Sequence, residues 1–406
     1  MRLQDRHWRI RSGKIGTIFV DATHTAKTGA RTGAQTVLRG LLWGLSKSGV
    51  NLQIVRWSKW RHDLLPLNRT QTGRLGVVQR IEGVRSKSQA GAWLVLPEII
   101  YGNRALRVID HARCRKMRVA AIFHDAIPLS HPNLTRPDAV ERHPEYMRTL
   151  CRTDLVIAVS DSVAEQFRAF AQRNGQRLPP LSVCRLPGEL VGEKRCAAKD
   201  VNFFGPVRIL CVSTLDPRKN HKTLLEAFEL ACTAISGPAE LHLVGDRYKD
   251  AELIVDLVKR AAARNRSVTW HGRATDGQLN EFYRDCDFTV YPSLVEGFGL
   301  PIVESLWNRR PCICANFGEM AEIAKDGGCL TCDVRGPSQL SQAMVALATQ
   351  PALRERLINE IARRKHKTWA EYAAEICENL GNASRISEES ASLPLRSGRR
   401  TSTLLH

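Results

Sequence analysis

Residues 291–304 read Tyr291-Pro-Ser-Leu-Val-Glu-Gly-Phe-Gly-Leu-Pro-Ile-Val-Glu304. The pattern predicts a strand end, a glycine-containing loop and a helix whose first turn carries Pro301, where proline removes no needed backbone donor. The free amides at such a helix start attract anions, and Gly297 and Gly299 allow a ligand to approach the backbone closely. The stretch therefore predicts a cradle for a diphosphate at the edge of a parallel sheet.

Two glutamates frame this cradle. Glu304 lies about one turn after Pro301, where its carboxylate can accept hydrogen bonds from the two hydroxyls of a ribose. Glu296 precedes the turn and can hold a sugar hydroxyl. The alternative is a simple connection from strand to helix with two solvated glutamates, and the spacing alone does not decide between them.

A second stretch, Val212-Ser-Thr-Leu-Asp-Pro-Arg-Lys-Asn-His221, follows the strand expected at 207–213. Arg218 and Lys219 thus leave that strand at its carboxyl end, the edge where open parallel sheets bind ligands. Paired cations there can neutralise a diphosphate and stabilise it as it departs. Taken alone, the pair could equally be two exposed charges on a surface turn.

Strand-like and helical runs alternate along the whole chain, which is typical of parallel sheets built from strand-helix-strand units. We expect a first domain over 1–190, a link around 187–206 and a second domain over 205–380, whose helices after about 350 pack back on the first. Beyond 381 the serine-rich segment to 406 has too few apolar residues to pack, so we expect a disordered tail. The expected strands lie at 15–20, 52–56, 92–96, 119–123, 155–158, 207–213, 240–245, 268–271, 288–291, 312–315 and 328–332.

Size and charge narrow the class of protein. The chain has 406 residues, 43% of them hydrophobic, which favours two globular domains over one. Neither an apolar run of spanning length nor a secretory signal is recognisable, so we expect a cytoplasmic protein. The net charge of +19 indicates attraction to polyanions. We favour an anionic membrane face over nucleic acid, because the basic clusters lack the aromatic interleaving of an RNA-stacking module.

The twelve cysteines indicate reduced thiols in the absence of a signal peptide. Cys312, Cys314, Cys329 and Cys332 could form a tetrahedral zinc site, but both pairs lie in short apolar runs where cysteine commonly fills a core. We expect the latter and predict no metal site. The D-x-D sequence at 285–287 also runs straight into a strand instead of an open, metal-holding loop.

Together these motifs resemble glycosyltransferase family 4, the retaining, mannosyltransferase-like group 1 glycosyltransferases, most clearly from about Val207 to Leu347. The resemblance implies the α/β GT-B fold, two Rossmann-like domains facing across a cleft, with no metal or other cofactor. The E-x7-E pair of the family matches Glu296 and Glu304, and its cationic pair matches Arg218 and Lys219. By that resemblance, Glu304 binds the donor ribose, Glu296 meets the donor sugar, and the cations grip the diphosphate. The donor-binding loop would comprise Gly297, Phe298, Gly299 and Leu300.

Two weaker matches lie in the first half. His124, in the segment Ala120-Ala-Ile-Phe-His-Asp-Ala-Ile-Pro-Leu129, resembles the histidine that family members place beside the donor sugar. Gly33, in the segment Thr28-Gly-Ala-Arg-Thr-Gly-Ala-Gln35, resembles a glycine loop near the donor phosphate or the acceptor. The chain departs from the family where Glu319 and Ala321 replace an expected glycine and proline, which leaves the shape of that loop open.

The residues of these motifs are most similar to those of bacterial mannosyltransferases that build surface polysaccharide. We therefore expect GDP-mannose as donor, with UDP-glucose and dTDP-rhamnose as the alternatives. The acceptor would be a glycan, and a lipid-diphosphate carrier would suit the basic surface. Two rival classes are a sugar-nucleotide epimerase of the same fold and a basic nucleic-acid-binding protein. An NAD enzyme is disfavoured, since no G-x-G-x-x-G follows the first strand of either half.

Overall fold

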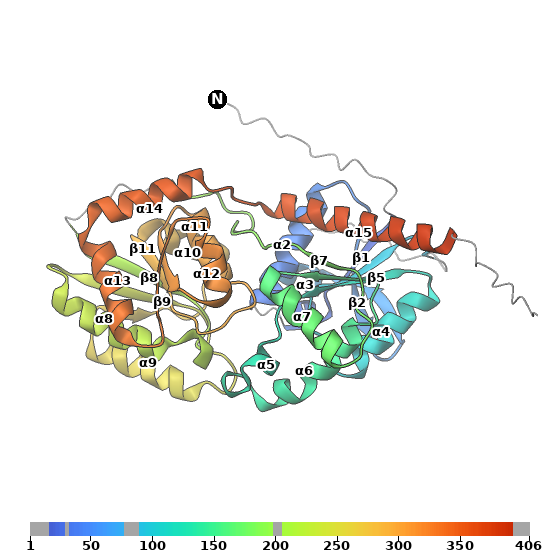
Figure 1. The fold of residues 1–406 in the computed structure, drawn as a ribbon, viewed down its shortest axis with the longest axis horizontal. Helices are drawn as coiled ribbons and strands as arrows, with labels where there is room; N and C mark the ends of the chain where they lie inside the picture. Colours follow the sequence, from blue (N-terminus) through green and yellow to red (C-terminus); the bar gives the residue numbers. More distant parts are fainter. Residues whose placement is uncertain (1–15, 29–31, 77–88, 198–204, 393–406) are drawn as a thin grey trace, which may run out of the picture.

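The computed structural model describes residues 16–28, 32–76, 89–197 and 205–392, with the side chains described up to residue 386. Two α/β domains lie side by side along the long axis of the molecule (Figure 1). The first is built on a seven-stranded sheet of order β3-β2-β1-β4-β5-β6-β7, and the second on a six-stranded sheet of order β10-β9-β8-β11-β12-β13.

All strand pairs of the first sheet are parallel except β2 with β3, which form an antiparallel hairpin at one edge. Its central strands are buried apolar runs because helices cover both faces. The strands are β1 (Ile18–Asp21), β2 (Leu52–Ser58), β3 (Asp63–Pro66), β4 (Trp93–Leu96), β5 (Arg118–Phe123), β6 (Leu155–Ala158) and β7 (Leu181–Val183). The helices are α1 (Thr23–Thr28), α2 (Gly33–Lys47), α3 (Arg69–Leu75), α4 (Asn103–Cys114), α5 (Ile127–Ser130), α6 (Pro137–Leu150) and α7 (Asp161–Arg173).

The second sheet is wholly parallel. Its strands are β8 (Val207–Val212), β9 (Ala239–Val244), β10 (Val268–Trp270), β11 (Phe288–Tyr291), β12 (Cys312–Ala315) and β13 (Cys329–Cys332). Its helices are α8 (His221–Ala234), α9 (Glu252–Arg264), α10 (Asp276–Asp285), α11 (Leu300–Trp307), α12 (Gly318–Ala324), α13 (Pro337–Thr349) and α14 (Pro351–Arg363).

The last described helix, α15 (Trp369–Ser392), leaves the second domain and lies along α2 of the first (Figure 1). The two helices are in direct contact: a Cβ added to Gly40 would lie 2.1 Å from the ring of Trp369. The Trp369 indole N–H also donates to the carbonyl of Glu189 at 2.8 Å. This helix therefore ties the end of the second domain to the first.

The expectation of disorder from residue 381 was wrong over 381–392, where α15 continues. Ile376, Leu380 and Ala383 form a buried stripe along the helix. Ser384 accepts a hydrogen bond from the Trp93 indole and donates its hydroxyl to the Leu380 carbonyl. Ser384, one of the serines that suggested a tail, is thus accommodated within the helix, while residues 393–406 lie outside the described part.

No helix within the described ranges combines the length and the apolar character needed to cross a membrane.

Candidate functional site

The two stretches singled out in the sequence meet at one edge of the second sheet. Strands β8 and β11 are parallel neighbours, so the loops that follow them begin side by side. The loop after β8 leads into a 3-10 turn over Pro217–Lys219, and the loop after β11 leads into α11. The amide of Leu294 donates to the carbonyl of Arg218 at 2.8 Å, which fastens the two loops together.

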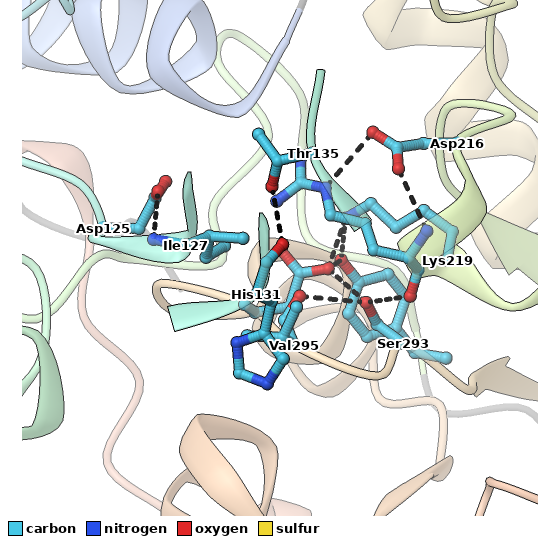
Figure 2. A network of polar contacts seen from close by, with 11 residues as sticks. Asp125, Ile127, His131, Thr135, Asp216, Lys219, Ser293 and Val295 are labelled. Carbon is cyan, nitrogen blue, oxygen red and sulfur yellow. Dashed lines mark hydrogen bonds and ion pairs between the residues drawn. The ribbon is translucent and has the colours of Figure 1, made fainter. Parts of the chain in front are cut away.

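Lys219 sits in a buried polar cluster at this edge. Its ammonium donates to the Tyr291 hydroxyl at 2.6 Å and is paired with the carboxylate of Glu296. The Tyr291 hydroxyl in turn donates to Oε1 of Glu296 at 2.8 Å, and the Ser293 hydroxyl contacts the same oxygen. Figure 2 shows Lys219 and Ser293 within this network of polar contacts. We call these four residues the Lys219 cluster.

Lys219 and the adjacent Arg218 together set the ionisation of Glu296 in the Lys219 cluster. Burial alone would raise the pKa of Glu296, but Lys219 and Arg218 lower it to about 2. The carboxylate is therefore ionised at any physiological pH, and it balances the ammonium beside it. Because both side chains are only 10% exposed, the pair is held in place before any ligand arrives.

Arg218 lies next to this cluster and is more accessible, with 24% of its side chain exposed. Its Nε is 3.2 Å from Oδ2 of Asp216, whose other oxygen caps the 3-10 turn by accepting from the Arg218 amide. Burial lowers the pKa of Arg218, but the carboxylates of Glu296 and Asp216 outweigh it and raise the pKa above its ordinary value. The guanidinium is thus a fixed cation that is partly open to solvent.

Glu304 occupies a different environment on α11. Its Oε2 accepts a hydrogen bond from the Tyr283 hydroxyl of α10 at 3.0 Å, and 7% of the residue is exposed. Burial raises the pKa of Glu304 to about 7, with the tyrosine bond opposing the shift. The two glutamates of the motif therefore differ in ionisation at neutral pH.

Gly297 has a neighbour that the sequence did not indicate. A Cβ at this position would lie 1.9 Å from the carbonyl oxygen of His124, at the end of β5 in the first domain. The carbonyl of Gly297 also accepts a hydrogen bond from Ser160 Oγ of the first domain at 2.9 Å. Glycine is needed here because the backbones of the two domains touch, whereas the sequence reasoning assigned the close approach to a diphosphate.

Gly299 adopts the left-handed conformation, with φ of 111°, and ends the loop directly before α11. The neighbouring Phe298 and Leu300 are buried, so this loop is packed in place. Gly33 faces it from the first domain: a Cβ on Gly33 would lie 3.9 Å from Leu300 Cδ1. The starts of α2 and α11 therefore lie together across the domain boundary. Residues 29–31 of the predicted glycine loop lie outside the described ranges.

His124 directly follows the strand β5 at the same boundary. Its Nε2 lies 2.7 Å from the carbonyl of Pro97, so this nitrogen carries the proton and donates it. Burial lowers the pKa of His124, which leaves a neutral ring with Nδ1 as an acceptor. The structure thus brings His124, Gly33, the loop 296–300 and the cationic pair to one junction.

Sequence reasoning missed several residues of this junction. Tyr291 and Ser293 stood inside the quoted stretch, but only contact with Glu296 reveals their part. Tyr283 lies in α10 and carried no local signal. Glu319, noted as a departure from the family, turns toward α7 of the first domain, where its carboxylate accepts from Ser162 at 2.9 Å. It therefore adds a further contact between the domains.

The four clustered cysteines lie on two paired strands, with Cys312 opposite Cys329. Cys312 and Cys314 are fully buried in β12 as members of the hydrophobic core. Within the described ranges, no three side chains of histidine, cysteine, aspartate or glutamate are grouped as a metal ion would require.

Comparison with known proteins places this site in a family. Residues 198–364 match the model of the group 1 glycosyl transferases. Sucrose-phosphate synthase of Thermosynechococcus elongatus superposes with a TM-score of 0.65 at 16% identity, over 92% of this chain and 100% of that structure. Anabaena HepE in complex with UDP and glucose gives 0.59 at 15% identity, over 93% and 100%. These likenesses confirm the predicted two-domain α/β architecture of the GT-B type.

Curated relatives are closer in sequence. The serotype-specific mannosyltransferase WbdA of Escherichia coli is 25% identical over 333 residues, which is 76% of this chain but only 40% of the length of that protein. The O-antigen chain mannosyltransferase B of Escherichia coli is 30% identical over 264 residues, covering 63% of this chain and 68% of the relative. The predicted family is confirmed: the chain belongs to the group 1 glycosyltransferases.

Proposed function

We propose that this chain transfers mannose from GDP-mannose to a glycan acceptor, with retention of anomeric configuration, in the synthesis of a bacterial surface polysaccharide. The names of the mannosyltransferase relatives support the sugar and the pathway class. The guanine base and the retention rest on the motif resemblance.

The observation that carries this proposal is the position of Arg218 beside the Lys219 cluster. Group transfer from a nucleotide sugar leaves a diphosphate on which negative charge develops, and preorganised cations stabilise it most effectively when they need not move. Arg218 is fixed by Asp216, and Lys219 is fixed by Tyr291 and Glu296. We therefore assign these two cations to the leaving diphosphate.

The start of α11 completes the donor site in this proposal. Its first turn carries no acidic residue, so the partial positive charge of the helix start is not cancelled there. Together with Arg218 and Lys219 it supplies charge that a metal ion supplies in other transferases, and we propose a metal-independent reaction with no other cofactor. Glu304 would receive the ribose hydroxyls, and His124 would face the sugar from the first domain.

The acceptor is proposed to lie on the side of the first domain, attached to a lipid diphosphate at the cytoplasmic face of the plasma membrane. The net charge of +19 supports this, because both a lipid diphosphate and the membrane are anionic.

A nucleotide-sugar panel tests the donor. Purified protein is incubated with GDP-mannose, UDP-glucose and dTDP-rhamnose, with and without EDTA, and both thermal shift and release of nucleotide diphosphate are followed. We expect GDP-mannose alone to respond, equally in EDTA, and NMR of the product to show the donor's anomeric configuration. A response to another donor, or inversion, would contradict the assignment.

Paired variants test the cations. Removing one electrostatic stabiliser of a transition state costs about a hundredfold to a thousandfold in turnover. We expect Arg218→Ala with Lys219→Ala to lower turnover by at least that factor while the circular dichroism spectrum stays unchanged. Lys222→Ala is the matched control, since its side chain is 71% exposed on the neighbouring helix α8. Unchanged turnover in the double variant would overturn the role of the cations.

A further inference from the structure

The β2–β3 hairpin presents a tryptophan to solvent. Trp60, at the tip between the two strands, is 97% exposed, the highest value among the large exposed apolar side chains of the described residues. Lys59 and Arg61 on either side are exposed as well. A tryptophan that buries almost none of its surface in its own chain can gain the free energy of burial only from another surface.

The hairpin is held firmly at its base, so the exposure of its tip is built into the fold. The amide of Arg61 donates to the Ser58 hydroxyl at 3.3 Å, which closes the turn. Asp63, the first residue of β3, pairs with Arg115 at 3.0 Å and lies 3.1 Å from Nε2 of His111. The His62 ring meets that of Trp57 edge to face.

The ion pair between Asp63 and Arg115 also places further cations near the hairpin. Arg115 follows directly on α4, and it is flanked by the exposed Arg113 and Lys116. Together with the tip, these residues make a predominantly basic surface around one large aromatic side chain, with Asp63 paired to Arg115 at its base. We call this surface the hairpin patch: Lys59, Trp60, Arg61, Arg113, Arg115 and Lys116.

We propose that the hairpin patch docks this chain on an anionic lipid surface, with Trp60 inserted at the level of the headgroups. Tryptophan has an apolar ring and a polar N–H, a combination that favours the membrane interface. Lysine and arginine near an anionic surface each contribute about fivefold to binding. The charge complementarity favours lipid over an acidic protein, since a bilayer meets the whole patch at once. The proposal rests on the proposed lipid-linked acceptor for its biological meaning only.

Vesicle sedimentation tests it in the absence of donor and acceptor. The full chain is mixed with vesicles of phosphatidylglycerol and phosphatidylcholine, or of phosphatidylcholine alone, at low salt. We expect binding to the anionic vesicles only. Trp60→Ala should weaken it about tenfold, from the lost burial of one large side chain. Lys59→Ala with Arg61→Ala should weaken it about 25-fold.

The second domain offers a matched control. Leu253 on α9 is 84% exposed, and Leu253→Ala should leave vesicle binding unchanged. Equal binding of wild type and Trp60→Ala would overturn the proposal. So would a Trp60-dependent dimer in analytical ultracentrifugation, or binding of an oligonucleotide as tight as that of vesicles and equally sensitive to Trp60→Ala.

A native thiol within this region gives a second readout that needs no substitution. Cys114 is exposed between Arg113 and Arg115, whereas Cys232 in the second domain is half-buried. Anionic vesicles should slow maleimide labelling of Cys114, followed by mass spectrometry, and leave that of Cys232 unchanged. Equal protection of both thiols, or of neither, would contradict docking through this surface. Trp60→Ala should retain transfer to a water-soluble acceptor, so failure of docking and failure of the proposed transfer are separable.

Discussion

The buried carboxyl of Glu304 predicts a pH-dependent affinity for the donor nucleotide. Its pKa is raised to about 7 by burial, and its proposed ligand is a pair of ribose hydroxyls that donate hydrogen bonds. An ionised carboxylate accepts both bonds, whereas the protonated group accepts them poorly. If only the ionised form binds, one pH unit below the pKa lowers affinity about tenfold, so the dissociation constant of GDP-mannose should rise about tenfold from pH 8 to pH 6.

Isothermal titration calorimetry with GDP-mannose measures this effect cleanly, because its diphosphate diester keeps a constant charge over that range. Glu304→Gln should bind more weakly, with a flat pH profile. Tyr283→Phe removes the hydroxyl that lowers the pKa of Glu304, so the midpoint of its profile should move to higher pH. A 2′,3′-dideoxyribose analogue should lose both affinity and pH dependence. A flat wild-type profile, or an unchanged slope in Glu304→Gln, would refute the assignment of Glu304 to the ribose.

The same shift carries a stability consequence whose sign is fixed. A carboxyl whose pKa rises on folding makes its full contribution to stability below 4.5, its pKa in the unfolded chain. That contribution is lost as the pH rises through its folded pKa of about 7. The loss amounts to about 3 kcal/mol at 1.36 kcal/mol per pKa unit. Glu304→Gln should therefore raise the free energy of unfolding at pH 8 by up to that amount and leave it unchanged at pH 4, as measured by urea denaturation. Equal effects at both pH values would contradict the raised pKa.

Substitutions at two glycines test the contacts between the two domains. Gly297→Ala should abolish transfer with little loss of secondary structure, because the new Cβ would lie 1.9 Å from the His124 carbonyl and force the domains apart; small-angle scattering would show the wider separation, and full activity would contradict this role. Gly40→Ala should lower the free energy of unfolding by about 1–3 kcal/mol through its clash with Trp369. Gly73→Ala, in open space on α3, is the control and should stabilise slightly. Equal effects of these two substitutions would argue against tight docking of α15.

The strands that could be predicted are the buried ones, because burial requires an apolar sequence that is visible in the strand itself. A strand such as β5 is buried on both faces, and its continuous run of apolar residues predicts it. The edge strands β3 and β7 were not predicted. The residues of β3, Asp63–Pro66, include an aspartate and a proline, which an edge tolerates because only one side is paired.

The site shows the same division. Four site residues could be located because each follows a strand that the sequence predicts, and parallel strands bring such residues to one edge of the sheet. They are Glu296, Glu304, Arg218 and Lys219. Tyr283 could not, because it reaches Glu304 from another helix, 21 residues earlier in the chain. The contact of Gly297 with the first domain depends on how the two domains pack against each other. A local sequence pattern does not predict that packing.

The two glutamates of the quoted stretch show why spacing alone cannot assign chemistry. They lie eight residues apart, and both are more than nine-tenths buried. Burial raises the pKa of each carboxyl, yet the pKa of Glu296 is about 2 because two cations face it, while that of Glu304 is about 7, where a tyrosine hydroxyl donates to it. Environments that separate the pKa values of two carboxyls give them separate tasks. Glu296 stays ionised beside Lys219 and opposes the burial that lowers the pKa of that lysine, whereas Glu304 can change its ionisation when a ligand arrives.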